Sequence, residues 1–264
     1  MQAIFTFLGT GPSAGIPLIG CSCDVCRSSD PHNQRLRPAG VIHVGDKVLL
    51  IDIGPDFRQQ ALKFGLSHLD GVLITHAHFD HIAGIDELRA LNFQQKKSFP
   101  CLMSKETLRE IESRFPYLFQ SNEEKKSKSA QLDCQALPKE AGETDFLGVK
   151  IRYMSYRQAG MKVTGYRIGN FAYVSDIREY DDSIFDELKG VKKLVLSALR
   201  EEPSPVHFSL TEAVAFARKV GAEKTWLTHM SHSVEHNWAC RHLPPDVQPG
   251  YDGLTIPFQM NPHA

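Results

Sequence analysis

The feature that most constrains this chain is the six-residue run from His76 to His81, which contains three histidines and Asp80 and directly follows the apolar run Gly71 to Thr75. Such an apolar run is typical of a buried strand. On a loop that leaves a strand, His76 and His78 can converge on one ion and leave the aspartate and the last histidine for another; on a helix they would point to nearly opposite sides. The spacing predicts a two-metal site, and the alternative is a solvated polar turn.

The residue types in this cluster also indicate a kind of chemistry. Imidazole and carboxylate ligands suit zinc, manganese, iron or nickel. A metal site with an open position lowers the pKa of a bound water to about 7, so that a hydroxide nucleophile is available at neutral pH. The cluster therefore favours a hydrolase.

Short apolar strands alternate with amphipathic helices along the chain. Lys47 to Ile53 has the composition of a strand, and Ser209 to Val220 has the spacing of a helix with Ser209 as its N-cap. Because strands recur in both halves, we expect two sheets packed face to face with helices outside, rather than one doubly wound sheet. The length fits a single domain over residues 1–264, with a polar surface insertion near 119–147.

The distribution of charge narrows the range of partners. The 30 basic and 31 acidic residues are interleaved and give a formal net charge of −1, so we expect no duplex nucleic acid and favour a small anionic phosphodiester as substrate. No apolar run approaches the roughly 20 residues needed to cross a bilayer. Met1 to Gly9 has the pattern of a strand and not of a signal peptide. These observations predict a cytoplasmic protein with no membrane partner.

The cysteine spacing predicts a second, structural metal site. Cys21, Cys23 and Cys26 lie within six residues, and in a reducing compartment such a cluster is more typical of metal binding than of a disulfide framework. Three thiolates are one ligand short of a tetrahedral zinc site, so the fourth ligand must come from elsewhere in the chain. The alternative is that Cys21, Cys23 and Cys26 are buried free thiols. We interpret the three isolated cysteines, Cys101, Cys134 and Cys240, as free thiols.

The pattern His-x-His-x-Asp-His after a strand resembles the signature of the metallo-β-lactamase superfamily. The resemblance implies an α/β fold with four layers, αβ/βα, in which two mixed β-sheets are flanked by helices. It also implies that Asp176 is the carboxylate that bridges the two ions and that His229 is the last histidine. The full set of implied metal ligands is His76, His78, Asp80, His81, Asp176 and His229.

Further stretches narrow the resemblance to the PhnP-type branch, which includes phosphodiesterases acting on cyclic ribose phosphates. These stretches are Gly9-Thr10-Gly11, Gly20 to Cys26, Leu50 to Arg58, Pro205 to Phe208 and Tyr251-Asp252-Gly253. The resemblance implies that His232 is the fourth ligand of a structural zinc held by Cys21, Cys23 and Cys26. It implies that His207 contacts the substrate and can act as general acid, and that the protein forms a homodimer.

Two further positions bear on the site. The family places another ligand histidine before the strand that leads to the bridging aspartate, but no histidine lies between Val149 and Asp176, and Gln158 stands near the matching position. An amide oxygen can bind a hard ion such as manganese but is a poorer ligand for zinc than imidazole. Asp52, which ends an apolar strand, is expected to hold the histidine loop without binding metal.

These observations predict a metal-dependent hydrolase, in which a metal-bound hydroxide attacks a small cyclic or nucleotide-like phosphodiester. Asp80 and Asp176 would hold the ions, and Asp176 would orient the nucleophile. The expected cofactors are Zn²⁺ at the cysteine site and two divalent ions, Zn²⁺ or Mn²⁺, at the histidine cluster. The alternatives are a metal-binding module that has lost catalysis, suggested by Gln158, or another hydrolase on the same fold, either tRNA 3′-processing-like or acting on thioesters or lactones.

Overall fold

The chain folds into two mixed β-sheets packed face to face, in a computed structural model that describes residues 1–120 and 128–260. Over these residues the first sheet has the order β14 (Thr255–Gln259), β1 (Gln2–Gly9), β2 (Ala39–Val44), β3 (Lys47–Ile51), β4 (Gly71–Leu73), β5 (Phe99–Ser104) and β6 (Leu132–Leu137). The second sheet has the order β13 (Val247–Pro249), β12 (Lys224–Thr228), β11 (Lys193–Ser197), β10 (Phe171–Val174), β9 (Met161–Ile168), β8 (Val149–Gln158) and β7 (Ala141–Phe146). Each sheet has an antiparallel part and a parallel part.

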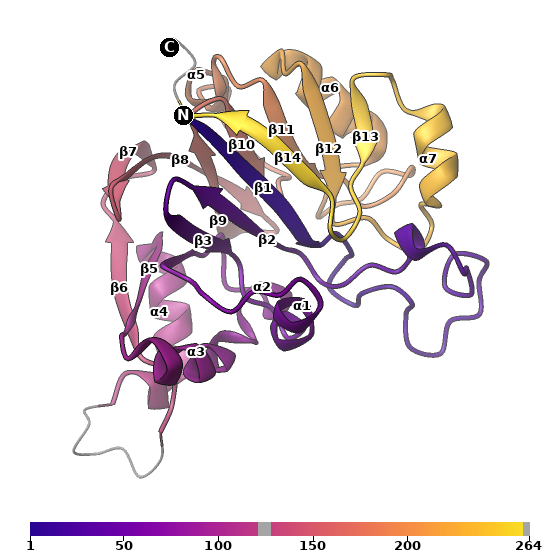
Figure 1. Cartoon of the computed structure of the whole chain (residues 1–264). Coiled ribbons are helices and arrows are strands. Elements are labelled where there is room, and N and C mark those ends of the chain that lie inside the picture. The colour runs from indigo at the N-terminus through magenta and orange to yellow at the C-terminus, as the bar shows by residue number, and fades with distance from the viewer. Residues whose placement is uncertain (121–127, 261–264) are drawn as a thin grey trace.

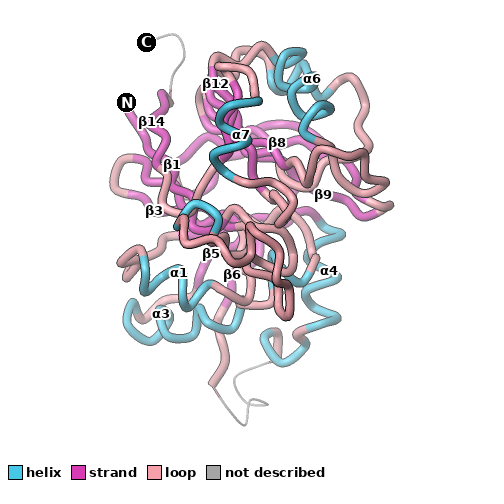
Figure 2. The backbone as a smooth tube through the Cα atoms, turned by 90° about the vertical axis from the view of Figure 1, so that its right-hand side faces the viewer, coloured by secondary structure: helices cyan, strands magenta, loops and turns pink. Residues whose placement is uncertain are grey.

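Helices cover the outer faces of both sheets (Figure 1, Figure 2). The first half contributes α1 (Phe57–Lys63), α2 (Phe79–Ile82), α3 (Leu88–Gln95) and α4 (Lys105–Arg114), and the second contributes α5 (Ile184–Leu188), α6 (Leu210–Val220) and α7 (His236–His242). Short 3-10 helices lie at η1 (Pro31–Asn33), η2 (Ile85–Glu87) and η3 (Pro116–Leu118). This arrangement is the αβ/βα sandwich that the resemblance implied. Within the described ranges, no helix is long and apolar enough to cross a membrane.

Strand alternation distributes apolar side chains between the layers. In β3, Leu49 and Ile51 face the space between the sheets, and Leu50 packs beneath the helices of the first half. This follows from the two-residue period of a strand, and it leaves each sheet apolar on both faces. The central layer joins the sheets directly: the rings of Phe5 on β1 and Phe171 on β10 stack with centroids 4.9 Å apart.

Three hydrogen bonds from β9 tie the sheets together near the end of β4. The hydroxyl of Tyr166 on β9 donates to the carbonyl oxygens of Ile74, at 2.8 Å, and Leu102, at 3.0 Å. The backbone N–H of Thr164, also on β9, donates to the carbonyl of Thr75 at 2.9 Å. Because these contacts end one residue before the histidine run, they fix that run relative to the second sheet.

The stretch near 119–147 departs from the expectation of a polar surface insertion. Leu132–Leu137 forms β6 and Ala141–Phe146 forms β7, the last strand of the first and second sheet respectively, so the loop prediction was wrong there. Both strands lie at a sheet edge, where side chains on one face stay exposed and a polar composition is tolerated. Residues 121–127, in the centre of the expected insertion, lie outside the described residues.

The helix expected from Ser209 is confirmed and bears on the site, because His207 lies two residues before its N-cap. The Ser209 side chain accepts a hydrogen bond from the backbone of Glu212, and the Glu212 carboxylate accepts one from the backbone of Ser209. This reciprocal pair is a capping box, which fixes the first turn of α6. The segment before α6 therefore has a defined direction.

Candidate metal centre

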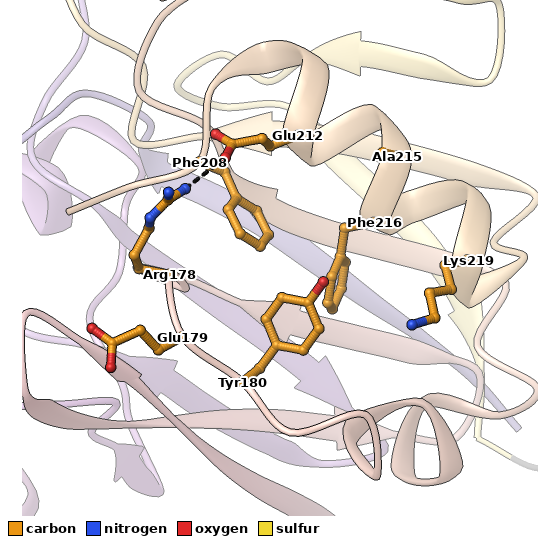
Figure 3. Close-up of a pocket in the computed structure, with 8 residues that line it drawn as sticks. All are labelled: Arg178, Glu179, Tyr180, Phe208, Glu212, Ala215, Phe216 and Lys219. Atoms are coloured by element: carbon orange, nitrogen blue, oxygen red, sulfur yellow. Dashed lines mark hydrogen bonds and ion pairs between the residues drawn. The ribbon is translucent and has the colours of Figure 1, made fainter. Parts of the chain in front are cut away.

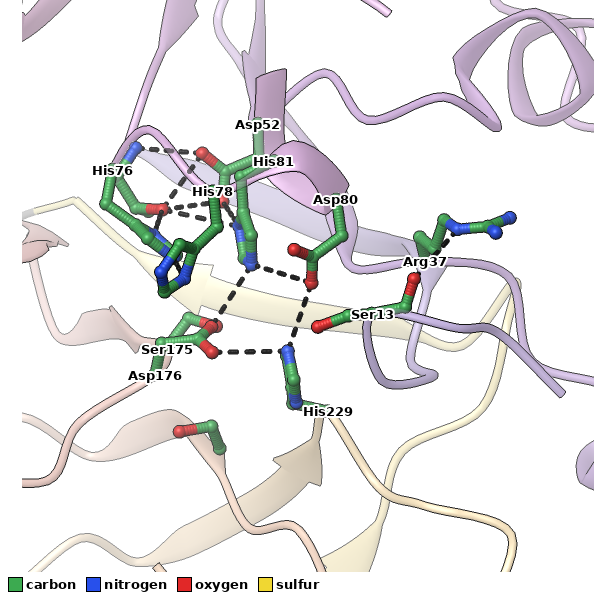
Figure 4. A network of polar contacts seen from close by, with 12 residues as sticks. Ser13, Arg37, Asp52, His76, His78, Asp80, His81, Ser175, Asp176 and His229 are labelled. Carbon is green, nitrogen blue, oxygen red and sulfur yellow. Dashed lines mark hydrogen bonds and ion pairs between the residues drawn. The ribbon is translucent and has the colours of Figure 1, made fainter. Parts of the chain in front are cut away.

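Side chains from both sheets meet at one edge of the sandwich (Figure 4). His76 and His78 lie on the loop after β4, and Asp80 and His81 lie on the short helix α2. Asp176 follows β10 and His229 follows β12, so the second sheet contributes the other two members. All six are buried except His78, which is partly exposed. Asp176 lies between His81, from the first half of the chain, and His229, from the second.

The carboxylates stand between the imidazoles. Asp176 Oδ2 lies 3.2 Å from His81 Nε2, and Asp176 Oδ1 lies 3.2 Å from His229 Nε2. Asp80 Oδ2 lies 3.4 Å and 3.3 Å from the same two nitrogens. Asp80, His81 and His229 therefore form one compact group, with Asp176 reaching it through both of its oxygens.

His76 and His78 form the other half of the cluster. The Nε2 atom of His76 lies 2.9 Å from Nδ1 of His78. Ligand-type atoms of His76, His81 and Asp176 also lie within 4.8 Å of one another. Burial lowers the pKa of His76 well below its ordinary value, so its imidazole is neutral, which is the form that binds metal ions. The geometry brings together all six residues named from the sequence.

Asp52 and Thr75 orient two of these imidazoles. Asp52 is fully buried, and its Oδ2 lies 2.7 Å from Nδ1 of His81, which leaves Nε2 to face the cluster. Asp52 also accepts hydrogen bonds from the backbone N–H of Thr75, at 2.8 Å, and from its hydroxyl. The Thr75 hydroxyl is 2.9 Å from Nδ1 of His76. Asp52 thus contacts the histidine loop from behind, as expected from the sequence.

Opposite charges in contact determine the protonation of the cluster. Burial lowers the pKa of His81, but the carboxylates of Asp80, Asp52 and Asp176 outweigh this effect and raise its pKa well above the ordinary value. Burial raises the pKa of Asp176, but His229 and His81 outweigh it and hold the pKa well below the ordinary value. Asp80 and Asp176 are therefore ionised at neutral pH, as cation ligands must be.

The donor atoms fit divalent metal ions. Imidazole nitrogens together with carboxylate oxygens are the ligand set that zinc and manganese accept. His81 Nε2 is fully buried and, within the described part of the chain, forms no hydrogen bond, although two carboxylates lie close to it. An imidazole nitrogen so placed has the orientation of a ligand. We conclude that the residues present can hold metal.

Three residues of the site adopt left-handed backbone conformations. Asp52, Asp176 and His229 have φ values of 60°, 55° and 61°. Such values cost energy for residues other than glycine, although Asp and His tolerate them better than most. Each follows a strand, so the turn directs the side chain from the strand end into the cluster.

Gln158 and His207 complete the wall on the side of the second sheet. Gln158 is the last residue of β8, and its amide nitrogen lies 3.3 Å from Asp176 Oδ1 and 3.0 Å from His207 Nε2. His207 Nδ1 lies 3.4 Å from Asp176 Oδ1. Burial lowers the pKa of His207 to about 4, which opposes the protonated form that a general acid needs at neutral pH.

The three clustered cysteines meet His232. Nδ1 of His232 lies 3.3 Å from Cys21 Sγ, 3.5 Å from Cys23 Sγ and 3.7 Å from Cys26 Sγ. A backbone N–H donated by Cys26 to the Cys23 sulfur is the largest cause that lowers the pKa of Cys23 to about 6. A thiolate at neutral pH is the form that binds metal, and three thiolates with one imidazole match a structural zinc site.

Arg35 supports the loop that carries His232. The side chain is 1% exposed, and its Nη1 donates to the carbonyls of Val234, at 3.0 Å, and Ser231, at 3.5 Å, one on either side of His232. Its Nε donates to the carbonyl of His32. Arg35 therefore joins the N-terminal loop to the loop after β12, and its burial leaves it no contact with solvent.

Sequence reasoning missed two residues that contact the cluster. Thr75 and Ser175 each directly precede a metal-ligand candidate, and the Ser175 hydroxyl donates to Asp176 Oδ2 at 2.6 Å. Ser175 is held in turn by the Tyr156 hydroxyl, which donates to its carbonyl. The available signal was position alone: a hydroxyl residue at the end of an apolar strand, next to a histidine or aspartate.

A cavity of about 470 Å³ lies beside α6 (Figure 3). Phe208 points into it, where Tyr180 and Phe216 form an aromatic wall, and the Arg178–Glu212 ion pair, at 2.7 Å, stands at its edge. None of the residues named from the sequence as metal ligands lines this cavity.

The sandwich with histidines and aspartates at the strand ends of both sheets defines a class of metal-dependent hydrolases. The model of the β-lactamase superfamily domain matches residues 47–230. This match covers more than half of the chain, which therefore belongs to the metallo-β-lactamase superfamily and, as its relatives show, to the PhnP-type branch of it.

The crystal structure of a diphosphatase from the PhnP family superposes with a TM-score of 0.90 and 36% identity, over 99% of both chains. The octanoyltransferase of Porphyromonas gingivalis is 35% identical over 251 residues, which are 94% of this chain and 50% of that protein. This chain thus spans about half the length of that relative. Anti-Pycsar protein Apyc1 of Paenibacillus harenae is 25% identical over 229 residues, covering 83% of this chain and 91% of that one.

Proposed function

We propose that this protein is a metal-dependent phosphodiesterase that hydrolyses a small cyclic or nucleotide-like phosphodiester. The observation that carries the proposal is the position of Asp176, whose carboxylate lies 3.2 Å from both His81 and His229 and within 4.8 Å of a ring nitrogen of His76. A carboxylate shared between two groups of imidazoles is suited to hold a pair of cations. Bound divalent ions supply Lewis-acid stabilisation of charge on phosphate oxygens and lower the pKa of water to about 7.

The residues of the chain have separate roles in this proposal. Asp80, His81 and His229 would hold one ion and His76 with His78 the other, with Asp176 placed to serve both groups. Asp52 keeps His81 in the tautomer that directs Nε2 to the cluster, since its carboxylate accepts from Nδ1–H. His207 lies 3.4 Å from Asp176 and would donate a hydrogen bond or a proton from its ring to a substrate oxygen.

The nature of the relatives supports a phosphorus-centred reaction. The PhnP-family protein that matches this chain over 99% of both lengths is a diphosphatase. The formal net charge of −1 supports a small anionic substrate in preference to a long nucleic acid, because long nucleic acids are bound through extended basic surfaces.

The test is hydrolysis of bis-p-nitrophenyl phosphate by purified protein supplied separately with Zn²⁺, Mn²⁺ and Ni²⁺. We expect turnover with at least one ion, and its loss in the variants His78→Ala and Asp176→Ala. Asp182→Ala is the matched control, since Asp182 is exposed and forms an ion pair with Lys219 on the surface. Silence with every ion, despite measurable ion binding, would favour the alternative of a metal-binding module without catalysis.

We take hydrolysis of an acyl thioester as a second candidate, because this chain matches half of a protein named as an octanoyltransferase. The same cluster can activate water toward a carbonyl carbon as well as toward phosphorus. An octanoyl thioester assayed beside the phosphodiester separates the two, because the preferred substrate has the larger kcat/KM. A larger value for the thioester would overturn the phosphodiesterase proposal.

A further inference from the structure

The two halves of the cluster differ in one polar neighbour, the side chain of Gln158. On one side, Asp80, His81 and His229 provide two imidazoles and a carboxylate within 4.8 Å of one another. On the other side, His76 and His78 stand with Asp176, and the polar side chain that contacts Asp176 from β8 is the amide of Gln158. The second half therefore matches the first in its two imidazoles and one carboxylate, and it has the neutral amide of Gln158 beside them.

Gln158 is buried, with 3% exposure, and its hydrogen bonds are incomplete. The amide nitrogen donates to Asp176 Oδ1 at 3.3 Å and contacts the His207 ring, whereas Oε1, in the part of the chain described, has no partner. A buried polar atom without a partner costs about 1–3 kcal/mol. The χ3 torsion of a glutamine is only weakly restricted. The Gln158 amide can therefore rotate and turn its oxygen toward an ion beside Asp176.

The chemistry of an amide oxygen makes such a site selective. Carboxylate and carbonyl oxygens suit manganese and magnesium, whereas imidazoles favour zinc. We propose that Gln158 Oε1 is the fourth ligand of the half formed by His76, His78 and Asp176, and that this half is a weak, manganese-preferring site beside a tight zinc site at Asp80, His81 and His229. The inference rests on the proposed two-ion function and specifies which ion occupies which half.

Mn²⁺ binding can be measured without turnover. Protein is stripped with a chelator and given two equivalents of Zn²⁺, one for the cysteine site and one for the tight half. Mn²⁺ is then titrated while electron paramagnetic resonance reports the free ion. Thiolates select softer ions, so the cysteine site does not take up Mn²⁺. We expect one bound Mn²⁺ per chain in the natural protein.

Two substitutions at the same position distinguish a ligand from a structural residue. Gln158→Leu removes the oxygen and should abolish Mn²⁺ uptake while leaving the tight Zn²⁺ bound. Gln158→His supplies an imidazole and should raise the affinity of this half for Zn²⁺ by more than about tenfold, since imidazole is the better zinc ligand. Gln135→His is the matched control, because Gln135 is exposed on β6 and adds a histidine away from the cluster. Circular dichroism establishes that each variant is folded.

The outcomes separate this inference from the proposed function. Mn²⁺ uptake that is unchanged in both Gln158 variants, or two Zn²⁺ ions bound with equal affinity in the natural cluster, would overturn the assignment of Gln158. Hydrolysis of bis-p-nitrophenyl phosphate can persist in that case, and the proposed function then stands. If Mn²⁺ binding changes with residue 158 as expected but the protein hydrolyses no ester, the assignment of Gln158 as a metal ligand stands. The proposed phosphodiesterase function is then rejected.

Discussion

The substitution Asp52→Asn tests whether the support behind the cluster controls metal binding. Asp52 is fully buried and accepts hydrogen bonds from His81 Nδ1, at 2.7 Å, and from the backbone and hydroxyl of Thr75. An asparagine of the same shape presents one oxygen and one NH₂ group. If its oxygen keeps the bonds from Thr75, its NH₂ group faces His81 Nδ1, and the imidazole must then place its proton on Nε2, where it blocks a metal ligand.

The size of the effect follows from the contact that is lost. A hydrogen bond to a charged group contributes about 1.5–3 kcal/mol. At about 1.4 kcal/mol for each factor of ten, its loss weakens metal binding by roughly 10- to 150-fold. This range overlaps the roughly 10- to 100-fold commonly caused by removing a partner of a ligating histidine. We therefore expect D52N to fold and to bind Zn²⁺ at the cluster at least tenfold more weakly.

Competition with a chromophoric chelator measures this affinity. Asp70→Asn is the matched control, because Asp70 also contacts a histidine, His68 at 3.3 Å, and accepts a backbone N–H, but it lies before β4 and outside the cluster. D70N should bind Zn²⁺ as the natural protein does. A folded D52N with unchanged Zn²⁺ affinity would refute the reasoning that Asp52 sets the tautomer of His81.

Three further substitutions test features that hold the site in place. Tyr166→Phe removes the hydroxyl that joins the two sheets and should lower the free energy of unfolding by about 1–3 kcal/mol in urea titrations, and a smaller change would mean that the contact is dispensable. Arg35→Met should weaken Co²⁺ binding at the cysteine site, seen in the thiolate-to-cobalt absorption band, because the loop bearing His232 loses its support; an unaltered band and affinity would exclude this role. Burial raises the pKa of Asp252 to about 6, so the stability that its protonated form provides is complete below about pH 4 and is lost as pH rises through about 6. Urea unfolding across this range should therefore show the natural protein losing up to about 3 kcal/mol relative to Asp252→Asn, and parallel pH profiles would contradict the expectation.

The sequence predicted the part of the site that is local in the chain. His76 to His81 could be interpreted because ligand types stood together after an apolar strand, and Cys21 to Cys26 for the same reason. Asp176 and His229 came from the family resemblance, since a single Asp or His at a strand end carries no signal of its own. Thr75 was missed because its role depends on Asp52, and that contact exists only once β3 and β4 are paired.

The fold was predicted where burial leaves a clear pattern. The strand from Lys47 and the helix capped by Ser209 were evident from apolar spacing. Strands β6 and β7 were missed because each is the last strand of its sheet and alternates exposed polar residues with partly buried ones. Edge strands need less apolar surface, so composition alone does not distinguish them from a loop. The hydrogen-bonded pairing of β6 with β5 and of β7 with β8 identifies both segments as strands, and this pairing cannot be read from their composition.

The contribution of both sheets to the cluster has a mechanical consequence. Ions bound to His81 from one sheet and to Asp176 and His229 from the other would cross-link the two sheets, in addition to the contacts between their apolar faces. Occupancy then stabilises the docking of the two halves by an amount that grows with the ratio of free ion to dissociation constant. A chain divided between β6 and β7 would accordingly reassemble from its fragments more readily when metal is supplied.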